Sequence, residues 1–191
     1  MFVKPKITEQ QAKNIFASRK SILSFSSRLK KKKDEAFPKK VEVIYLPFYL
    51  FDVLVKRDNK AQKDRSPSTQ RVRLSVDGIL GHSVLYAKEA LDLANSQNLP
   101  AHDFVISPSV AEEIALKEYK GTLLEHGLRT RSFPQAEKIL GSQKIYYPFW
   151  IGYFRKGRGY DFKALDAVSG EIQGIKMRKV FLKAFRRMAD Q

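Results

Sequence analysis

The chain has 191 residues, of which 43% are hydrophobic and 12% aromatic, and its formal net charge is +16. This apolar content excludes a fully disordered chain and is sufficient for a packed core. The absence of cysteine excludes disulfides, thiolate nucleophiles and cysteine-ligated zinc. No apolar run has the length of a membrane-spanning helix, and residues 1–6 contain no secretory h-region, so we favour a cytoplasmic location.

The positive charge is distributed unevenly along the chain. Residues 1–75 carry a net +12, residues 76–128 a net −5 and residues 129–191 a net +9. A field of this size attracts polyanions even without a specific site. Two basic blocks flanking an acidic middle therefore dominate our expectations about partners.

The first half of the chain begins with a predicted helix and a predicted hairpin. Thr8 opens a capping box, and apolar residues then recur at helical spacing, which predicts an amphipathic helix over 9–31. Residues 41–55 are rich in β-branched and aromatic side chains and predict a strand, with a return strand at 71–76. The charged connection 56–70 has no large apolar side chain, so we expect it to be the most mobile internal segment.

The middle of the chain is predicted to be helical. A helix is expected near residues 85–95. A second capping box, formed by Ser109 and Glu112, predicts another helix, which Gly127 is well placed to end in a left-handed conformation.

The last third predicts a second hairpin and a terminal helix. A short helix over 134–140 leads into a strand over 144–154, and a compact loop over 155–159 joins it to a return strand over 160–166. The apolar residues that follow recur at i, i+3, i+4, i+7, i+8 and i+11, which predicts an amphipathic helix that docks on the protein. They are Met177, Val180, Phe181, Ala184, Phe185 and Met188.

The two hairpins share a sequence pattern. The segment 43–50 matches 144–151 at an offset of 101, with Tyr, Pro, Phe and a second aromatic in the same places. The turn Asp77–Gly81 matches Asp166–Gly170 at an offset of 89. An ordered match of helix, aromatic strand and Asp-x-x-x-Gly turn indicates an internal duplication.

The expected fold class is therefore α+β, with a duplicated helix-plus-antiparallel-hairpin unit, an approximate twofold and a C-terminal amphipathic helix. Residues 1–100 would form the first αββ unit, and residues 101–191 the second unit with the terminal helix. A single composite domain is the alternative.

The segment Phe162-Lys163-Ala164-Leu165-Asp166-Ala167-Val168-Ser169-Gly170-Glu171-Ile172 resembles the closing hairpin of PepSY-like repeats. The first copy matches less fully, because Asp77–Gly81 lacks the Ser/Thr-Gly-Glu ending. PepSY-like repeats are small helix-plus-sheet modules found mostly in bacterial extracytoplasmic proteins. The resemblance implies this fold and a non-catalytic, binding or inhibitory role, and it transfers no active-site residue.

Two sets of repeated residues have a structural and a functional interpretation. Asp77 and Asp166 fit turn caps that bond to backbone N–H groups, and the alternative is a symmetric pair of reactive or metal-binding carboxylates. Aromatic residues on strands are usually core, but strand alternation leaves room for an exposed patch that stacks on bases, with Tyr49 and Trp150 as its candidates. We favour the structural interpretation for both sets.

Basic residues provide the candidate polyanion-binding site. They cluster after the first predicted helix, in the first connection and in the second hairpin loop. The candidates are Arg28, Lys30, Lys31, Lys32, Lys33, Lys56, Arg57, Arg155, Lys156 and Arg158. Dipole complementation and solvated chain are the structural alternatives for them.

No catalytic or nucleotide-binding motif occurs, and His82, His102 and His126 are too scattered to indicate a metal site. We therefore expect no enzyme activity, cofactor or metal. The favoured function is a basic module that binds nucleic acid or another polyanion without sequence-specific readout. A protein-interaction or inhibitory module and peripheral attachment to an anionic membrane are the alternatives, and the sequence does not determine the oligomeric state.

Overall fold

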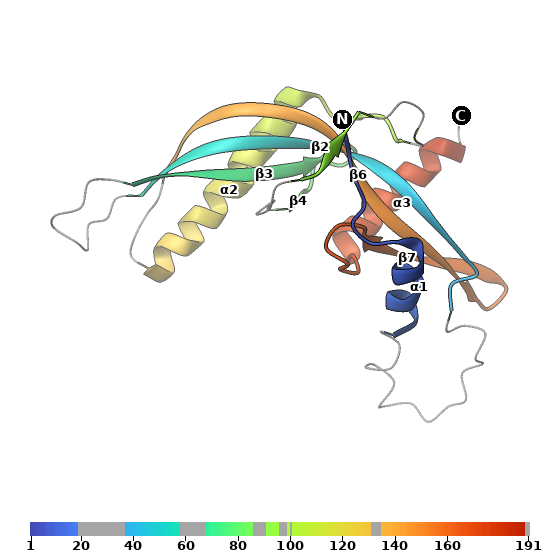
Figure 1. The fold of residues 1–191 in the computed structure, drawn as a ribbon. Helices are drawn as coiled ribbons and strands as arrows, with labels where there is room; N and C mark the ends of the chain where they lie inside the picture. The colour runs from blue at the N-terminus through green and yellow to red at the C-terminus, as the bar shows by residue number, and fades with distance from the viewer. Residues whose placement is uncertain are drawn as a thin grey trace. The chain divides into compact units, whose positions relative to one another are not determined.

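The computed structural model describes residues 1–18, 37–57, 68–85, 91–95, 99, 101–130 and 135–189 (Figure 1). In these ranges three helices accompany a mixed sheet of order β4-β3-β2-β6-β1-β5, and β7 also pairs with β6. The α+β class is confirmed. The elements are β1 (Phe2–Val3), α1 (Glu9–Ser18), β2 (Lys40–Arg57), β3 (Ser68–Asp77), β4 (Ser83–Leu85), β5 (Leu93–Ala94), α2 (Pro108–Thr130), β6 (Gln135–Lys156), β7 (Gly159–Asp166) and α3 (Ile175–Ala189).

The chain divides into two compact units whose segments alternate along the sequence. Unit 1 comprises Met1–Leu46, Asp92–His102 and Tyr146–Gln191. Unit 2 comprises Pro47–Leu91 and Asp103–Ile145. The long strands β2 and β6 each contribute one part to each unit, so both units contain residues from both halves of the sequence.

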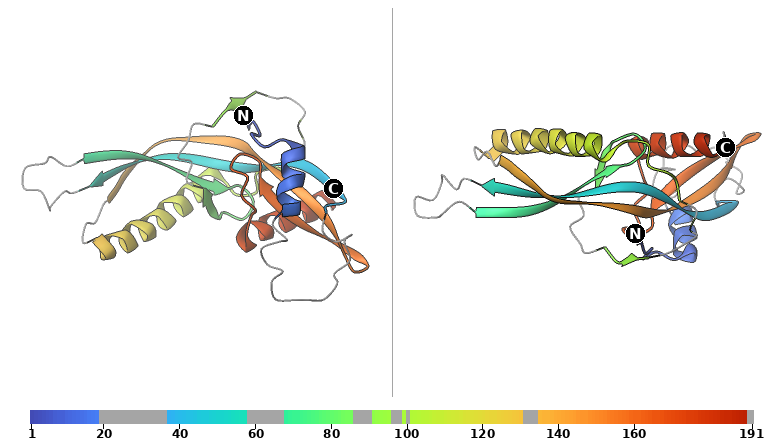
Figure 2. Two further views of the ribbon diagram at one scale, coloured as in Figure 1. Left: turned by 60° about the horizontal axis from the view of Figure 1, so that its bottom comes forward. Right: turned by 90° about the horizontal axis from the view of Figure 1, so that it is seen from above.

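Unit 1 is organised around the β6–β7 hairpin, which α1 and α3 cover on opposite faces (Figure 2). On one face, Ala12 and Phe16 of α1 pack with Trp150 and Phe154 of β6 and Leu165 of β7. Helix α1 thus belongs to the first half of the sequence, whereas the hairpin that it covers belongs to the second half.

Helix α3 covers the other face of this hairpin with its apolar stripe. Phe181 is fully buried and makes edge contacts with Phe149 and Phe162, at centroid distances of 5.2 and 6.2 Å. Met177, Val180 and Ala184 are also buried, so the predicted docking of this stripe is confirmed over most of its length. Met188, at the end of the stripe, is 60% exposed and lies outside the core.

Unit 2 is organised around the β2–β3 hairpin and α2. Tyr49, Phe51, Val53 and Val55 alternate along β2, and all four are buried against the helix together with residues of β3. Ala111, Ala115 and Tyr119 of α2 complete this core at a spacing of four residues. The helix again comes from the opposite half of the sequence to the hairpin that it covers.

The turn after β3 is built on Asp77. Its carboxylate Oδ1 accepts the N–H groups of Ile79 at 3.0 Å and Leu80 at 2.7 Å, and Oδ2 accepts that of His82 at 2.5 Å. Gly81 donates its N–H to the Asp77 carbonyl and has a φ of +78°, which favours glycine. The turn after β3 therefore has the cap that the sequence predicts.

The turn after β7 repeats this geometry. Asp166 Oδ1 accepts the N–H groups of Val168 at 2.8 Å and Ser169 at 3.0 Å, and Gly170 has a φ of +75°. The third partner differs, because the Tyr147 hydroxyl donates to Asp166 at 3.1–3.2 Å. Burial and the neighbouring Asp166 carboxylate raise the pKa of Tyr147 well above that of an ordinary tyrosine.

Each turn also anchors the segment that leads into a helix. In unit 2, the Gly78 carbonyl accepts the N–H groups of Val105 and Ile106, and the Tyr49 hydroxyl donates to the Ile106 carbonyl at 2.8 Å. In unit 1, the Ala167 carbonyl accepts from Lys6 and Ile7, and Trp150 Nε1 donates to the Ile7 carbonyl at 2.8 Å. The paired aromatics of the repeat are thus hydrogen-bonding anchors.

Two sequence-based helix predictions were wrong, and a third helix was predicted correctly but with the wrong cap and the wrong end. The described residues 91–95 contain strand β5 in place of a helix, and residues 135–140 belong to strand β6. Helix α2 starts at Pro108, with the Ser107 hydroxyl accepting the Val110 N–H at 3.3 Å, so Ser107 is the cap in place of Ser109. Gly127 lies within α2 and does not end it.

The first predicted helix is described only as far as Ser18. Its capping box is present, since Thr8 Oγ1 accepts the Gln11 N–H and Gln11 Oε1 accepts the Thr8 N–H. Most of the connection 56–70, for which mobility is predicted, lies outside the described residues.

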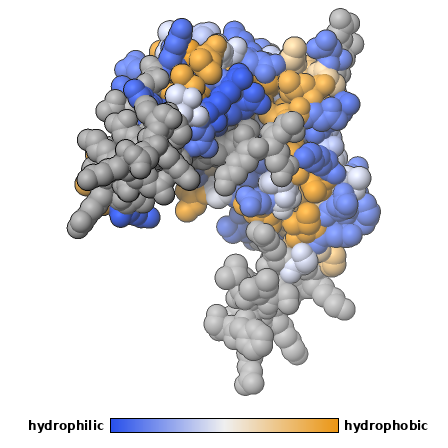
Figure 3. Space-filling model, turned by 60° about the vertical axis from the view of Figure 1, so that its left-hand side comes forward, coloured by the Kyte–Doolittle hydropathy of each residue, from blue (hydrophilic) through white to orange (hydrophobic). Residues whose placement is uncertain are grey.

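The described surface mixes polar and apolar side chains. On the face seen in Figure 3, hydrophobic residues (orange) lie between hydrophilic ones (blue). Within the described ranges, every helix is too short or too polar to span a bilayer.

Candidate polyanion-binding surface

The basic charge of the chain is concentrated in unit 1. This unit has 22 Lys/Arg and 9 Asp/Glu, a net +13, whereas unit 2 has 14 and 11, a net +3. The two blocks of the linear charge map, 1–75 and 129–191, therefore contribute their excess mostly to one compact unit. A binding surface for an anionic partner is expected there.

Most carboxylates described in unit 1 are already occupied by cations. Glu9 pairs with Lys13 at 2.6 Å, and Asp92 pairs with Lys4 at 3.3 Å. Glu42 pairs with Lys40. These pairs neutralise charge locally.

Asp161 on β7 pairs with two cations of unit 1. Its Oδ1 accepts from Arg178 of α3 at 2.6 Å and from the Phe162 N–H at 2.9 Å, while Lys156 reaches its other oxygen at 3.4 Å. The hydrogen bond from Arg178 lowers the pKa of Asp161 below its ordinary value. Arg178 also donates to the Phe162 carbonyl at 2.8 Å, so it closes part of the free edge of β7.

The outer face of α3 carries exposed cations. Because the apolar stripe faces the hairpin, the intervening positions point to solvent. In the described part of the chain they have no ion-pair partner. These residues are Lys176, Lys179, Lys183, Arg186 and Arg187.

The tip of the β6–β7 hairpin is a second exposed cationic group in unit 1. Gly157 and Arg158 form a two-residue turn, with φ of +60° at Gly157 and with Lys156 paired to Gly159. Arg155 and Arg158 are exposed, and within the described residues neither is in an ion pair. Directly opposite Arg155 stands Tyr160, which is 71% exposed.

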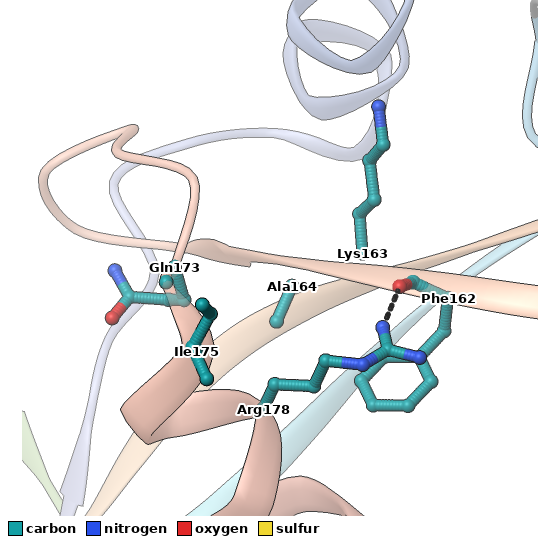
Figure 4. A pocket seen from close by; sticks show the side chains of 7 residues that line it. Phe162, Lys163, Ala164, Gln173, Ile175 and Arg178 are labelled. Atoms are coloured by element: carbon teal, nitrogen blue, oxygen red, sulfur yellow. Dashed lines mark hydrogen bonds between the residues drawn. The ribbon is translucent and has the colours of Figure 1, made fainter.

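A shallow recess lies farther along β7, between this strand and the start of α3. Its volume is about 190 Å³, and its lining is mainly apolar. Figure 4 shows Ala164, Ile175 and Arg178 around it, with the Arg178 guanidinium beside the Phe162 ring and Lys163 extending away. The guanidinium carbon lies 4.5 Å from that ring centroid. This space is below the ~300 Å³ of an ordinary small-molecule site.

The predicted basic candidates are only partly brought together. Arg155, Lys156 and Arg158 lie together at the hairpin tip of unit 1. Lys56 and Arg57 lie at the end of β2 in unit 2. The other five candidates, Arg28 and Lys30–Lys33, lie outside the described residues.

The predicted exposed aromatic patch is contradicted. Tyr49 is 2% exposed and Trp150 is 9% exposed, so neither offers a free ring face. Both side chains point into the cores of their units and donate hydrogen bonds to backbone carbonyls. These bonds explain why an aromatic residue with a polar group occupies both positions.

One functional candidate, Tyr160, was missed from the sequence, because the pattern identifies it only as the start of a return strand. A tyrosine two residues after a turn arginine, in Arg158-Gly159-Tyr160, is the signal that could have found it.

Comparisons with protein-family models, curated proteins and solved structures found no match for this chain. The PepSY-like resemblance of residues 162–172 therefore stays an expectation from the sequence.

Proposed function

We propose that the chain is a non-catalytic binding module that engages nucleic acid through the cations of unit 1, without reading base sequence. The observation that carries this proposal is the net +13 of unit 1 against +3 of unit 2. The exposed cations of α3 and of the hairpin tip that form no ion pair among the described residues are the groups that would contact phosphates. Such contacts release counterions and give affinity with little sequence preference.

A membrane partner has less support than a nucleic acid. A basic amphipathic helix binds lipid by placing its apolar face between acyl chains. The corresponding face of α3 is occupied, because Met177, Val180 and Phe181 are buried in unit 1. Only the cations remain for a lipid headgroup, so a membrane would be bound through charge alone.

Salt-dependent binding to oligonucleotides tests the proposal. The affinity for a DNA duplex should fall linearly with salt on a log–log plot, by about 0.9 per phosphate neutralised. Replacing Lys176, Lys179 and Lys183 on α3 with glutamine should weaken binding and flatten this slope. Replacing Lys117, Lys120 and Lys138, three exposed lysines of unit 2, with glutamine removes the same charge and is the matched control.

The two triple variants distinguish a local surface from a general charge effect. Equal losses in both would show that net charge alone drives binding and that unit 1 has no special role. Failure of the unmodified protein to bind DNA or RNA at low salt would contradict the proposed function. Binding to anionic vesicles but to no nucleic acid would favour the membrane alternative.

We also infer that both units descend from one duplicated helix-plus-hairpin unit related by an approximate twofold. The matching turns at Asp77 and Asp166, and the matching anchors at Tyr49 and Trp150, support this inference. An experimental structure tests it by superposing one unit on the other. Pro47 should then coincide with Pro148, and a mismatch of the turns would refute the duplication.

A further inference from the structure

Unit 1 carries an exposed tyrosine in the middle of its cationic hairpin tip. Tyr160 is 71% exposed and stands opposite Arg155 on the paired strand, so the two side chains share one face of the hairpin. Arg158 in the turn is two residues away. Solvent exposure of an aromatic ring in a basic setting leaves a π face free for a planar ligand.

The strand places this ring next to the apolar recess. Side chains at alternate positions of β7 point to one face, so Tyr160, Phe162 and Ala164 form a row at intervals of about 6.6 Å. Phe162 and Ala164 line the recess, together with Ile175 and Arg178 of α3. Phe162 and Ala164 are themselves 8% and 4% exposed, so Tyr160 is the exposed ring of this row and the recess lies beyond it along the strand.

We propose that this row, led by Tyr160, binds single-stranded nucleic acid by stacking on unpaired bases. The inference rests on the proposed function and gives it a preferred substrate class. Arg155 and Arg158 contact the phosphates, Tyr160 stacks on one base, and the recess takes the edge of a neighbouring base. In a duplex both faces of each base are already stacked, so Tyr160 contributes only to binding of single strands.

Stacking fits the absence of sequence-specific readout. Every base presents a π face, so a stacking tyrosine tolerates any sequence. The recess, at about 190 Å³, has room for the edge of a planar ring and too little for a larger ligand. Base-edge hydrogen bonding is not required at either place.

Variants at Tyr160 test the inference with labelled oligonucleotides. Tyr160→Ala should weaken binding of a single-stranded oligonucleotide about 5- to 150-fold, the range for loss of one base–aromatic stack. Tyr160→Phe should retain the affinity, and duplex binding should be unchanged in both variants. The high exposure of Tyr160 makes Tyr160→Ala compatible with folding, which thermal unfolding checks.

A direct readout comes from Tyr160→Trp. Stacking on a base should quench the fluorescence of the new indole when a single strand is added, and a duplex should leave it unchanged. Trp150, which is 9% exposed, supplies a constant background. Ile175→Ser, at a 78% exposed position beside the recess, should weaken single-strand binding less than Tyr160→Ala does.

The outcomes separate this inference from the proposed function. If the protein binds single strands and Tyr160→Ala binds them equally well, the stacking role is refuted while the phosphate-binding role stands. Equal losses for duplex and single strand in Tyr160→Ala would also refute it. If the unmodified protein binds neither single strands nor duplexes, both proposals are refuted.

Discussion

The turns at Asp77 and Asp166 share one backbone arrangement but satisfy their carboxylates differently. In unit 2 both oxygens of Asp77 accept backbone N–H groups, and the third donor is His82. In unit 1 only Oδ1 of Asp166 accepts backbone N–H groups, and the Tyr147 hydroxyl is the third donor. The sequence position equivalent to Tyr147 is Leu46. The comparison shows that one turn geometry is compatible with different third donors to the carboxylate.

The largest effect is expected from removing either carboxylate. Asp77→Ala and Asp166→Ala each leave buried or partly buried donors unsatisfied, at about 1–3 kcal/mol for each such group. Each carboxylate accepts from three donors, so both variants should lower the free energy of unfolding by about 3 kcal/mol or more. Urea titration at neutral pH measures this. If one of them has no effect, that turn is not the anchor that the hydrogen bonds indicate.

Asparagine substitutions sharpen the comparison. In Asp77→Asn, the amide nitrogen that replaces one oxygen cannot accept from a backbone N–H, so a bond is lost whichever way it faces. In Asp166→Asn, the amide oxygen can keep both backbone bonds while the Tyr147 hydroxyl rotates to accept. The cost at Asp77 should exceed that at Asp166 by about 1 kcal/mol. Equal losses in the free energy of unfolding would mean that the two turns do not differ in how their carboxylates are bonded.

Tyr147→Phe removes the hydroxyl that distinguishes the Asp166 turn from the Asp77 turn. This change removes one hydrogen bond to Asp166 and keeps the ring, so the expected loss in the free energy of unfolding is about 0.5–1.5 kcal/mol. Combined with Asp166→Ala, it should add little, because the bond is already absent. Additive losses in the double variant would show that the hydroxyl acts elsewhere.

The sequence predicts the hairpins and their turns because the determinants are local. Asp77, Asp166, Gly81 and Gly170 specify turn geometry within a few residues, and the strands before them alternate clearly. The helix prediction for 134–140 was wrong, because Ala, Glu, Lys and Leu favour a helix locally. Residues 135–140 belong to strand β6, so pairing in the sheet overrides that preference.

The exchange of helices between the halves could not be predicted from the pattern. Ala12 and Phe16 have the same spacing whichever hairpin they cover, and only tertiary contacts show that they pack on Trp150. For the same reason, the candidate binding surface could be predicted only in part. Arg155 and Arg158 lie three residues apart in the sequence, whereas their membership of one unit with the α3 cations depends on the fold.

The smallest predicted effect concerns two other carboxylates, one in each unit. Asp161 bonds to Arg178 in unit 1, and Asp52 bonds to Arg73 at 2.8 Å and Arg71 at 2.7 Å in unit 2. These hydrogen bonds lower the pKa of both aspartates. A depressed pKa in the folded state stabilises the protein above the unfolded pKa of about 3.9, and this contribution is lost as the pH falls through the folded value.

Asp161→Asn and Asp52→Asn should therefore lose stability at pH 7, and the difference from the unmodified protein should shrink at pH 3. Because these groups are partly exposed, each difference should stay below about 1 kcal/mol. Glu171→Gln, at an exposed position of unit 1, is the control. Asp161 joins β7 to α3, whereas Asp52 joins neighbouring strands, so only Asp161→Asn should also loosen α3. Hydrogen exchange of the α3 amides measures this, and unchanged protection would show that the apolar stripe alone holds the helix.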